Sequence, residues 1–448
     1  NTTTTDNTTT TDNTTTTDNT TNLTWTKQLG TSTTEYGYSV TTDSSGNIYV
    51  TGYTFGGLDG NTNANDGLSY VGQDIFLVKY NSSGTKQWTK QLGTVGFDAG
   101  YGITTDSSDN IYVTGYTRGG LDGNTSSGGQ DIILVKYNSS GTKQWTKQLG
   151  TSKNDFARSV TTDSSDNLYM TGYTVGGLDG NTNACPSPPQ YPPTEDIYLV
   201  KYNSSGTKQW TKQLGTCNRD GGYGITTDSS DNIYVTGYTY GDLDGNTNGD
   251  FDENGYIKLG EQDIFLVKYN SSGTKQWTKQ LGTSKTEYGS SVTTDSSGNI
   301  YVTGYTYGDL DGNTNSGGTG DIFLVKFNSS GTKQWTKQLG TSSGDKGNSV
   351  TTDSSGNIYV TGYTYGDLDG NTSSGGQDII LVKYNSSGTK QWTKQLGTSS
   401  NDVGNGVTTD SSDNIYVTGY TEGDLDGNTN LGQKDIFLVK YNSSETKQ

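Results

Sequence analysis

Residues 74–93 read DIFLVKYNSSGTKQWTKQLG, and close copies of this stretch recur along almost the whole chain. The hexapeptide WTKQLG returns every 57 to 67 residues, beginning at Trp25, Trp88, Trp145, Trp210, Trp277, Trp335 and Trp392. A unit of this length is too small to bury a core alone, so its copies must pack against one another. The spacing therefore predicts one assembly of repeats.

Each unit contains four short runs rich in β-branched and aromatic residues, which predict four β-strands. In the first complete unit these runs are residues 39–43, 47–54, 74–81 and 85–92. The intervening DSSG and NSSG segments have the composition of tight hairpin turns, so the first run pairs with the second and the third with the fourth. Apolar residues occupy both faces of the third run, so neighbouring units must cover both faces.

The two ends of the chain suggest a closed ring. The last copy stops at Gln448, directly before the position where another Trp would fall, and residues 24–29 supply the missing fourth run. We therefore expect an all-β fold over residues 23–448, a seven-bladed β-propeller of four-stranded antiparallel blades whose seventh blade is completed by strand 24–29. The alternatives are an open β-solenoid, a row of separate domains, or a polymer in which strand 24–29 enters a neighbouring copy.

The repeats resemble a known family. Units that read TTDSSGNIYVTGYT at 41–54 and DIFLVKYNSSGTKQW at 74–88 are similar to the SBBP beta-propeller repeat family of prokaryotes. The resemblance covers residues 23–448. It implies the propeller fold and a secreted or cell-surface setting, and it brings no reaction and no catalytic residues.

Charge and composition restrict the partners. The formal net charge is -18, which disfavours nucleic acids and anionic membrane surfaces and favours cations. No apolar stretch approaches the ~20 residues of a membrane span, and no signal peptide begins the chain. We interpret the sequence as a processed, extracellular product. Residues 1–22 form a low-complexity tail of Thr and Asn, which we expect to be a linker to other subunits or to a surface structure, or else a solvated tail.

The absence of histidine argues against an enzyme. Without His the chain has no Ser-His-Asp or Cys-His arrangement and none of the usual catalytic zinc sites. A pair of carboxylates could still hydrolyse glycosides, but nearly every Asp recurs around the ring, whereas a catalytic pair should occur once. We expect a noncatalytic protein.

The strongest chemical motif is a predicted calcium loop at residues 250–261. Oxygen ligands occupy positions 1, 3 and 5, Gly255 position 6, a backbone carbonyl position 7 and a carboxylate position 12, in the pattern of an EF-hand loop. The predicted ligands are Asp250, Asp252, Asn254, Tyr256 and Glu261. An acidic surface loop without a metal is the alternative.

Weaker versions of this spacing recur in the fourth to seventh units. The predicted ligands are Asp242, Asp244 and Asn246 in the fourth unit, Asp309, Asp311, Asn313 and Asp321 in the fifth, Asp367, Asp369, Asn371 and Asp378 in the sixth, and Asp424, Asp426, Asn428 and Asp435 in the seventh. Units one to three lack the first Asp and are expected to bind calcium more weakly. Because Asp, Gly and Asn also favour turns, turn formation alone is the alternative.

Two further modifications are expected. Cys185 precedes the third strand of the third unit and Cys217 follows the fourth, so both lie at one rim and can form a disulfide, which would indicate an oxidising compartment. Asn-Ser-Ser tripeptides at the hairpin tips are formal glycan acceptors and equally good turn residues, at Asn81, Asn138, Asn203, Asn270, Asn328, Asn385 and Asn442.

Two functions remain open. One is a calcium-stabilised structural, adhesive or assembly module on a cell surface or appendage. The other is a carbohydrate-binding lectin that uses the more variable rim, where the links between units carry aromatic residues. The tyrosines proposed for this lectin are Tyr36, Tyr38, Tyr101, Tyr223 and Tyr288.

The calcium interpretation predicts a dependence of stability on divalent ions. A chelator should lower the melting temperature, because an ion that binds only the folded chain stabilises it by mass action. Thermal unfolding with and without EGTA measures the effect. A melting curve that the chelator leaves unchanged would argue strongly against the metal.

Overall fold

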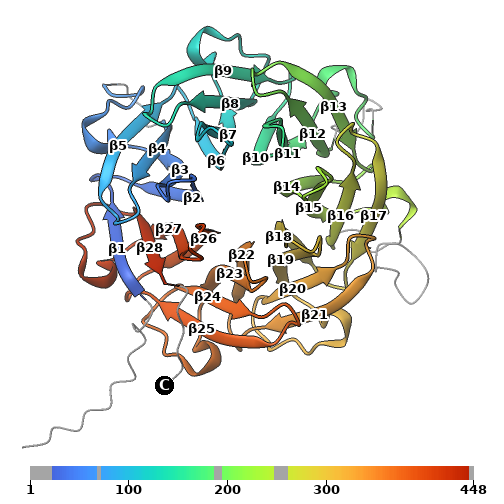
Figure 1. The fold of residues 1–448 in the computed structure, drawn as a ribbon. Coiled ribbons are helices and arrows are strands. Elements are labelled where there is room, and N and C mark those ends of the chain that lie inside the picture. The colour runs from blue at the N-terminus through green and yellow to red at the C-terminus, as the bar shows by residue number, and fades with distance from the viewer. Residues whose placement is uncertain (1–22, 68–71, 186–193, 247–260, 443–448) are drawn as a thin grey trace, which may run out of the picture.

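The computed structural model describes residues 23–67, 72–185, 194–246 and 261–442. Seven four-stranded antiparallel sheets stand radially around a central opening (Figure 1). The all-β, seven-bladed propeller predicted from the repeat is therefore confirmed. Within the described ranges, no helix has the length and apolarity needed to cross a bilayer.

The four strands of each blade run from the central opening outward. The innermost strands are β2 (Glu35–Thr42), β6 (Ala99–Thr105), β10 (Asp155–Thr162), β14 (Asp220–Thr227), β18 (Glu287–Thr294), β22 (Asp345–Thr352) and β26 (Asp402–Thr409). The second strands are β3 (Ile48–Thr54), β7 (Ile111–Thr117), β11 (Leu168–Thr174), β15 (Ile233–Thr239), β19 (Ile300–Thr306), β23 (Ile358–Thr364) and β27 (Ile415–Thr421). The third strands are β4 (Asp74–Tyr80), β8 (Asp131–Tyr137), β12 (Asp196–Tyr202), β16 (Asp263–Tyr269), β20 (Asp321–Phe327), β24 (Asp378–Tyr384) and β28 (Asp435–Tyr441). The outer strands are β5 (Lys86–Leu92), β9 (Lys143–Leu149), β13 (Lys208–Leu214), β17 (Lys275–Leu281), β21 (Lys333–Leu339), β25 (Lys390–Leu396) and β1 (Leu23–Leu29).

A short 3-10 helix with the sequence Leu-Asp-Gly follows the second strand of every blade. These helices are η1 (Leu58–Gly60), η2 (Leu121–Gly123), η3 (Leu178–Gly180), η4 (Leu243–Gly245), η5 (Leu310–Gly312), η6 (Leu368–Gly370) and η7 (Leu425–Gly427). The Leu of each helix is buried, so the helix anchors the loop that leads to the third strand.

The N-terminal strand closes the ring. β1 pairs antiparallel with β28, and the register places Leu23 opposite Tyr441 and Gln28 opposite Phe437. Gln28 also repeats a bond made in every other blade: its Nε2 donates to Asp435 Oδ2 (3.0 Å) and its Oε1 accepts from the Leu425 backbone N–H (3.2 Å). The first strand therefore occupies the outer position of the seventh blade within the same chain, as predicted.

Apolar side chains between adjacent blades form seven separate cores. In the first blade, Phe76, Val78 and Tyr80 pack with residues of the seventh blade. On the opposite face, Ile75 and Leu77 pack with the second blade. The prediction that both faces of the third strand are covered is thus confirmed, and each blade depends on two neighbours.

The innermost strand begins earlier than the sequence suggested. We expected it to start at residue 39 in the first blade, but β2 starts at Glu35 and contains a register shift between Gly37 and Ser39. Such a β-bulge leaves one residue, here Tyr38, unpaired and interrupts the alternation on which the prediction relied. Residues assigned to the variable rim therefore belong to the wall of the central opening.

Carboxyl groups are buried at every interface between blades. An acidic residue at the start of each innermost strand, or directly before it in the second blade, is fully buried; these residues are Glu35, Asp98, Asp155, Asp220, Glu287, Asp345 and Asp402. Burial raises the pKa of Asp98 to about 6 and that of Asp220 and Glu287 to about 7, although hydrogen bonds from nearby threonines oppose the shift. These acids therefore keep their protons to a higher pH in the folded chain than in the unfolded chain.

The pKa values of a second set of acidic residues shift in the opposite direction. Asp106 begins the turn between the first two strands of its blade and accepts hydrogen bonds from the Asn110 side chain and from Tyr112 (2.8 Å). Although burial opposes ionisation, these bonds hold the pKa of Asp106 below its usual value. The corresponding Asp163, Asp228 and Asp410 behave in the same way.

These two sets predict an acidic optimum of stability. Acids with raised pKa take up protons on folding, so their contribution is full below about pH 4 and is lost as the pH rises to about 7. Acids with lowered pKa destabilise the fold as the pH falls below about 4. We expect the highest melting temperature between about pH 4 and 5, with a decline toward pH 8.

The variant Glu287→Gln tests the assignment because glutamine keeps the size of the side chain but cannot ionise. The decline in unfolding free energy between pH 5 and 8 should become shallower, by at most about 1.4 kcal/mol per pH unit for one proton. Asp309→Asn, at an exposed position, is the matched control. If the unfolding free energy falls equally steeply with pH in Glu287→Gln and in the unsubstituted chain, the raised pKa assigned to Glu287 is contradicted.

Candidate functional site

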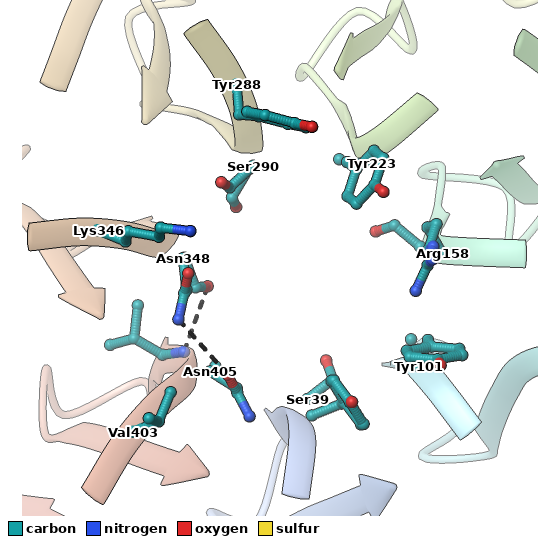
Figure 2. Close-up of a pocket in the computed structure, with 18 of the residues that line it drawn as sticks. Ser39, Tyr101, Arg158, Tyr223, Tyr288, Ser290, Lys346, Asn348, Val403 and Asn405 are labelled. Atoms are coloured by element: carbon teal, nitrogen blue, oxygen red, sulfur yellow. Dashed lines mark hydrogen bonds between the residues drawn. The ribbon is translucent and has the colours of Figure 1, made fainter. Parts of the chain in front are cut away.

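A central cavity of about 690 Å³ lies inside the ring of innermost strands (Figure 2). Its volume is within the range of roughly 300–1,000 Å³ for pockets that bind small ligands. Side chains from all seven blades line it, and the residue at the β-bulge of every blade is among them. The bulge turns one extra side chain of each blade toward the axis.

The bulge residue differs from blade to blade, although its neighbours in the repeat are nearly constant. In chain order the seven bulge residues are Tyr38, Tyr101, Arg158, Tyr223, Ser290, Asn348 and Asn405. Blades one to four thus contribute three aromatic rings and a guanidinium group, whereas blades five to seven contribute a hydroxyl and two amides. The bulge residues therefore form an aromatic half and a hydrogen-bonding half, and further tyrosines line the cavity in blades five to seven, namely Tyr288, Tyr305, Tyr363 and Tyr420.

Arg158 is held at the centre of the aromatic half. Its guanidinium carbon lies 4.6 Å from the ring centroid of Tyr101 and 5.1 Å from that of Tyr223. Figure 2 shows Arg158 between these two rings with its end directed into the cavity. Cation–π contact with both rings fixes the orientation of the side chain.

The hydrogen-bonding half is linked across three blades. Asn348 Nδ2 donates to the Gly404 carbonyl (2.9 Å), and Asn405 Nδ2 donates to the Gly37 carbonyl (2.8 Å). Lys346 lies nearby, with its Nζ 4.2 Å from the ring centroid of Tyr305, and burial lowers the pKa of this lysine. This half can accept and donate hydrogen bonds in directions set by the backbone of neighbouring blades.

The charge of the cavity is opposite to that of the protein. The chain carries a net charge of -18, yet Arg158 and Lys346 line the cavity and no Asp or Glu of the described residues does. Neither cation forms an ion pair with any described residue. The cavity is therefore a positively charged site in an acidic protein.

The five tyrosines predicted for a lectin all line this cavity. Tyr38, Tyr101 and Tyr223 are bulge residues, and Tyr36 and Tyr288 occupy an earlier position of their strands. The sequence identified the residues but placed them on the loop rim, and this placement was wrong because the bulged strands include them. Arg158, Lys346, Asn348 and Asn405 were missed, and a comparison of the repeats position by position would have found three of them.

In blades one to six the Asp of the Leu-Asp-Gly helix pairs with a Lys of the outer strand. Asp311 in the fifth blade accepts hydrogen bonds from Lys333 and Thr336. The same contacts join Asp244 to Lys275 and Thr278, and Asp369 to Lys390 and Thr393. These aspartates have φ values near +55°, which the turn requires. Asp426 occupies the same position of η7.

The other predicted ligands of these loops have separate partners. In the fifth to seventh units the first Asp accepts a backbone N–H six residues later, in Asp309–Asn315 (2.8 Å), Asp367–Ser373 (2.7 Å) and Asp424–Asn430 (2.8 Å). The corresponding residue after Asp242 lies outside the described ranges. Asn246, Asn313, Asn371 and Asn428 donate to the Leu carbonyl of their own helix. Asp321, Asp378 and Asp435 are buried and accept from a glutamine of the outer strand. Within the described ranges, no three acidic, His or Cys side chains converge on one point.

The stronger calcium motif lies almost entirely outside the described residues. Asp250, Asp252, Asn254 and Tyr256 fall in the range 247–260, and only Glu261 is described. Glu261 is half-buried, and its Oε2 has no hydrogen-bond partner among the described atoms. Calcium binding by loop 250–261 stays a prediction.

The remaining predicted sites lie at the two rims. A disulfide joins Cys185 and Cys217, whose Cα atoms are 4.6 Å apart. Asn81 Oδ1 accepts the Thr85 N–H (2.8 Å), and the same turn bond is made by Asn138, Asn203, Asn270, Asn328 and Asn385. The residues that would complete this turn after Asn442 lie outside the described ranges.

Fold and cavity together define a β-propeller with a ligand-sized central cavity. The chain belongs to the SBBP beta-propeller repeat family, whose repeat pattern matches residues 24–59, 87–122, 144–179, 209–244, 276–311, 334–369 and 391–426. Each match runs from an outer strand through the first two strands of the next blade to the Leu-Asp-Gly helix.

Proteins of similar sequence are much longer than this chain. An uncharacterized WD repeat-containing protein, L264, of Acanthamoeba polyphaga mimivirus is 28% identical over 465 residues, which cover 79% of this chain and 33% of the relative. The regulatory protein FlaEY of Caulobacter vibrioides is 28% identical over 292 residues, which cover 57% of this chain and 30% of the relative. The chain thus spans about a third of the length of these relatives.

The fold is also found among solved structures. The WD40 beta propeller domain of Doa1 aligns with a TM-score of 0.51 at 9% identity, over 95% of this chain and 97% of that domain. At this identity the likeness shows the fold alone.

Proposed function

We propose that this propeller is a noncatalytic extracellular binding module that recognises a saccharide in its central cavity. The observation that carries the proposal is the cavity wall, where tyrosines such as Tyr38, Tyr101 and Tyr288 lie beside the amides of Asn348 and Asn405 and the hydroxyl of Ser290. A sugar ring presents a face of C–H groups, which packs on aromatic rings, and a rim of hydroxyls, which need hydrogen-bond partners. Both surfaces have a counterpart here.

The surroundings of the cavity support binding without catalysis. The carboxyl groups of the innermost strands are buried between blades, where they accept hydrogen bonds from threonines, and none lines the cavity. A glycoside hydrolase would need two carboxyl groups on either side of the scissile bond. The described wall thus offers contacts for a ligand but no pair of carboxyl groups for acid–base catalysis.

The extracellular and adhesive parts of the proposal have other support. The Cys185–Cys217 disulfide is typical of an oxidising compartment. Residues 1–22, which lie outside the described ranges, have the composition of a linker and would connect the propeller to a surface or an assembly. Calcium bound by loop 250–261 would neutralise part of the negative charge and stabilise the rim.

The saccharide proposal predicts selective binding on a glycan array with calcium present. Tyr101→Ala removes one aromatic face and the support of Arg158, so it should weaken binding about 10-fold or more. Tyr307→Ala is the matched control, because Tyr307 is exposed and does not line the cavity. Circular dichroism confirms that both variants fold.

Two results would contradict the proposal. The first is the absence of saturable saccharide binding across the array. The second is binding that Tyr101→Ala leaves unchanged, which would place the sugar elsewhere on the ring. Self-association or surface attachment without any sugar would instead favour the structural module.

A further inference from the structure

The fold does not require the two cations of the central cavity, because other blades carry different residues at the same two positions. At the bulge position of Arg158 the other blades carry Tyr, Ser or Asn, and at the strand position of Lys346 they carry Tyr, Ala, Phe, Gly or Val. The blades form equally well with these residues, since all seven innermost strands pair in the same register. The positive charges are thus specific additions to the cavity wall.

Arg158 and Lys346 also lack the counterion that Lys434, a lysine in a similar aromatic setting, has. Lys434, at the rim, contacts Tyr420 in the same way as Lys346 contacts Tyr305, but its Nζ lies 3.1 Å from Glu422. Arg158 and Lys346 have aromatic neighbours and no carboxylate among the described residues. A charge that is partly removed from water without a counterion is costly, and a bound anion would offset this cost.

The geometry of Arg158 suits an anionic group of a ligand. Besides Tyr101 and Tyr223, the rings of Tyr173 (5.6 Å) and Phe156 (5.8 Å) lie near its guanidinium carbon. Its Nε is buried and has no hydrogen-bond partner among the described atoms, so this edge of the guanidinium is free to donate to a ligand. This edge binds carboxylate or sulfate oxygens through parallel hydrogen bonds. Figure 2 places Lys346 on the opposite wall, with its amino group directed inward.

We propose that the cavity selects an acidic saccharide, whose carboxylate or sulfate group is held by Arg158 while Lys346 adds attraction from the opposite wall. The inference rests on the proposed saccharide function and names the class of sugar. The tyrosines and amides bind the ring and hydroxyls of neutral and acidic sugars alike. The two cations discriminate between them, and they concentrate anions in a protein that otherwise repels them.

A matched pair of probes tests this selectivity. Methyl β-glucoside and methyl β-glucuronide differ only at C6, and the corresponding galactose pair and a 6-sulfated galactoside extend the comparison. Titration calorimetry or ligand-observed NMR should give at least about 10-fold tighter binding of the acidic member, and the difference should shrink at high salt. A preference for the sulfated or the carboxylated sugar identifies the anionic group.

Variants assign the preference to the two cations. Arg158→Gln should abolish most of the preference for the acidic sugar while changing the affinity for the neutral sugar less than about 3-fold. Lys346→Gln should reduce the preference by a smaller factor. Lys153→Gln removes one exposed positive charge of the same blade as Arg158 outside the cavity and should change nothing.

The outcomes separate this inference from the function on which it rests. Equal affinity for neutral and acidic sugars, or a preference that Arg158→Gln leaves intact, overturns the acidic class and leaves the saccharide function standing. Failure of every sugar to bind overturns both. A folded Arg158→Gln variant, verified by its melting curve, excludes loss of structure as the cause of a lost preference.

Discussion

The structure depends on the burial of both faces of every blade. Each blade packs apolar side chains against two neighbours, and each inter-blade core is formed by residues of two adjacent blades. No blade can therefore be terminal, because an exposed face would leave side chains such as Phe76 or Ile75 in water. The pairing of β1 with β28 satisfies this requirement within one chain and leaves the ring without a free end (Figure 1).

A ring of nearly identical blades creates a symmetric frame, and function must come from departures from the symmetry. The cores, the hairpin turns and the Leu-Asp-Gly helices repeat almost without change. The bulge residues differ, and all seven of them line the central cavity. Because the bulge is unpaired and faces an opening, substitutions there cost little in packing. The same frame can thus carry an aromatic half and an amide half without loss of the fold.

Much of the fold could be predicted from the sequence, and the reasons for success and failure are physical. The second, third and fourth strands were placed to within a residue or two, because alternation and turn residues mark them. The start of the innermost strand was missed because Gly37 and the bulge at Tyr38 break the alternation. The cavity could not be predicted, because it exists only when seven strands meet at one axis. Five of its tyrosines were identified because they lie in segments that vary between repeats, although these segments were assigned to the rim, whereas Tyr305, Tyr363 and Tyr420 were missed.

The Leu-Asp-Gly motif shows a different limit of sequence reasoning. The spacing of Asp309, Asp311 and Asn313 fits a cation loop and also fits a tight turn. In the structure Asp311 pairs with Lys333, which lies 22 residues further along the chain, and no local pattern announces that contact. Oxygen atoms at this spacing are thus consistent with a cation site and with a turn. The contact with a lysine distant in the sequence distinguishes the two.

Closure of the ring by the N-terminal strand is the central claim of this account, and the most direct test is thermal unfolding of a chain that begins at Gly30. This chain lacks β1, so the outer position beside β28 is empty and the seventh blade has three strands. The account predicts a clearly lower melting temperature than that of the full chain, with a broader transition that starts at the seventh blade. An unchanged melting temperature and an equally sharp transition would contradict it.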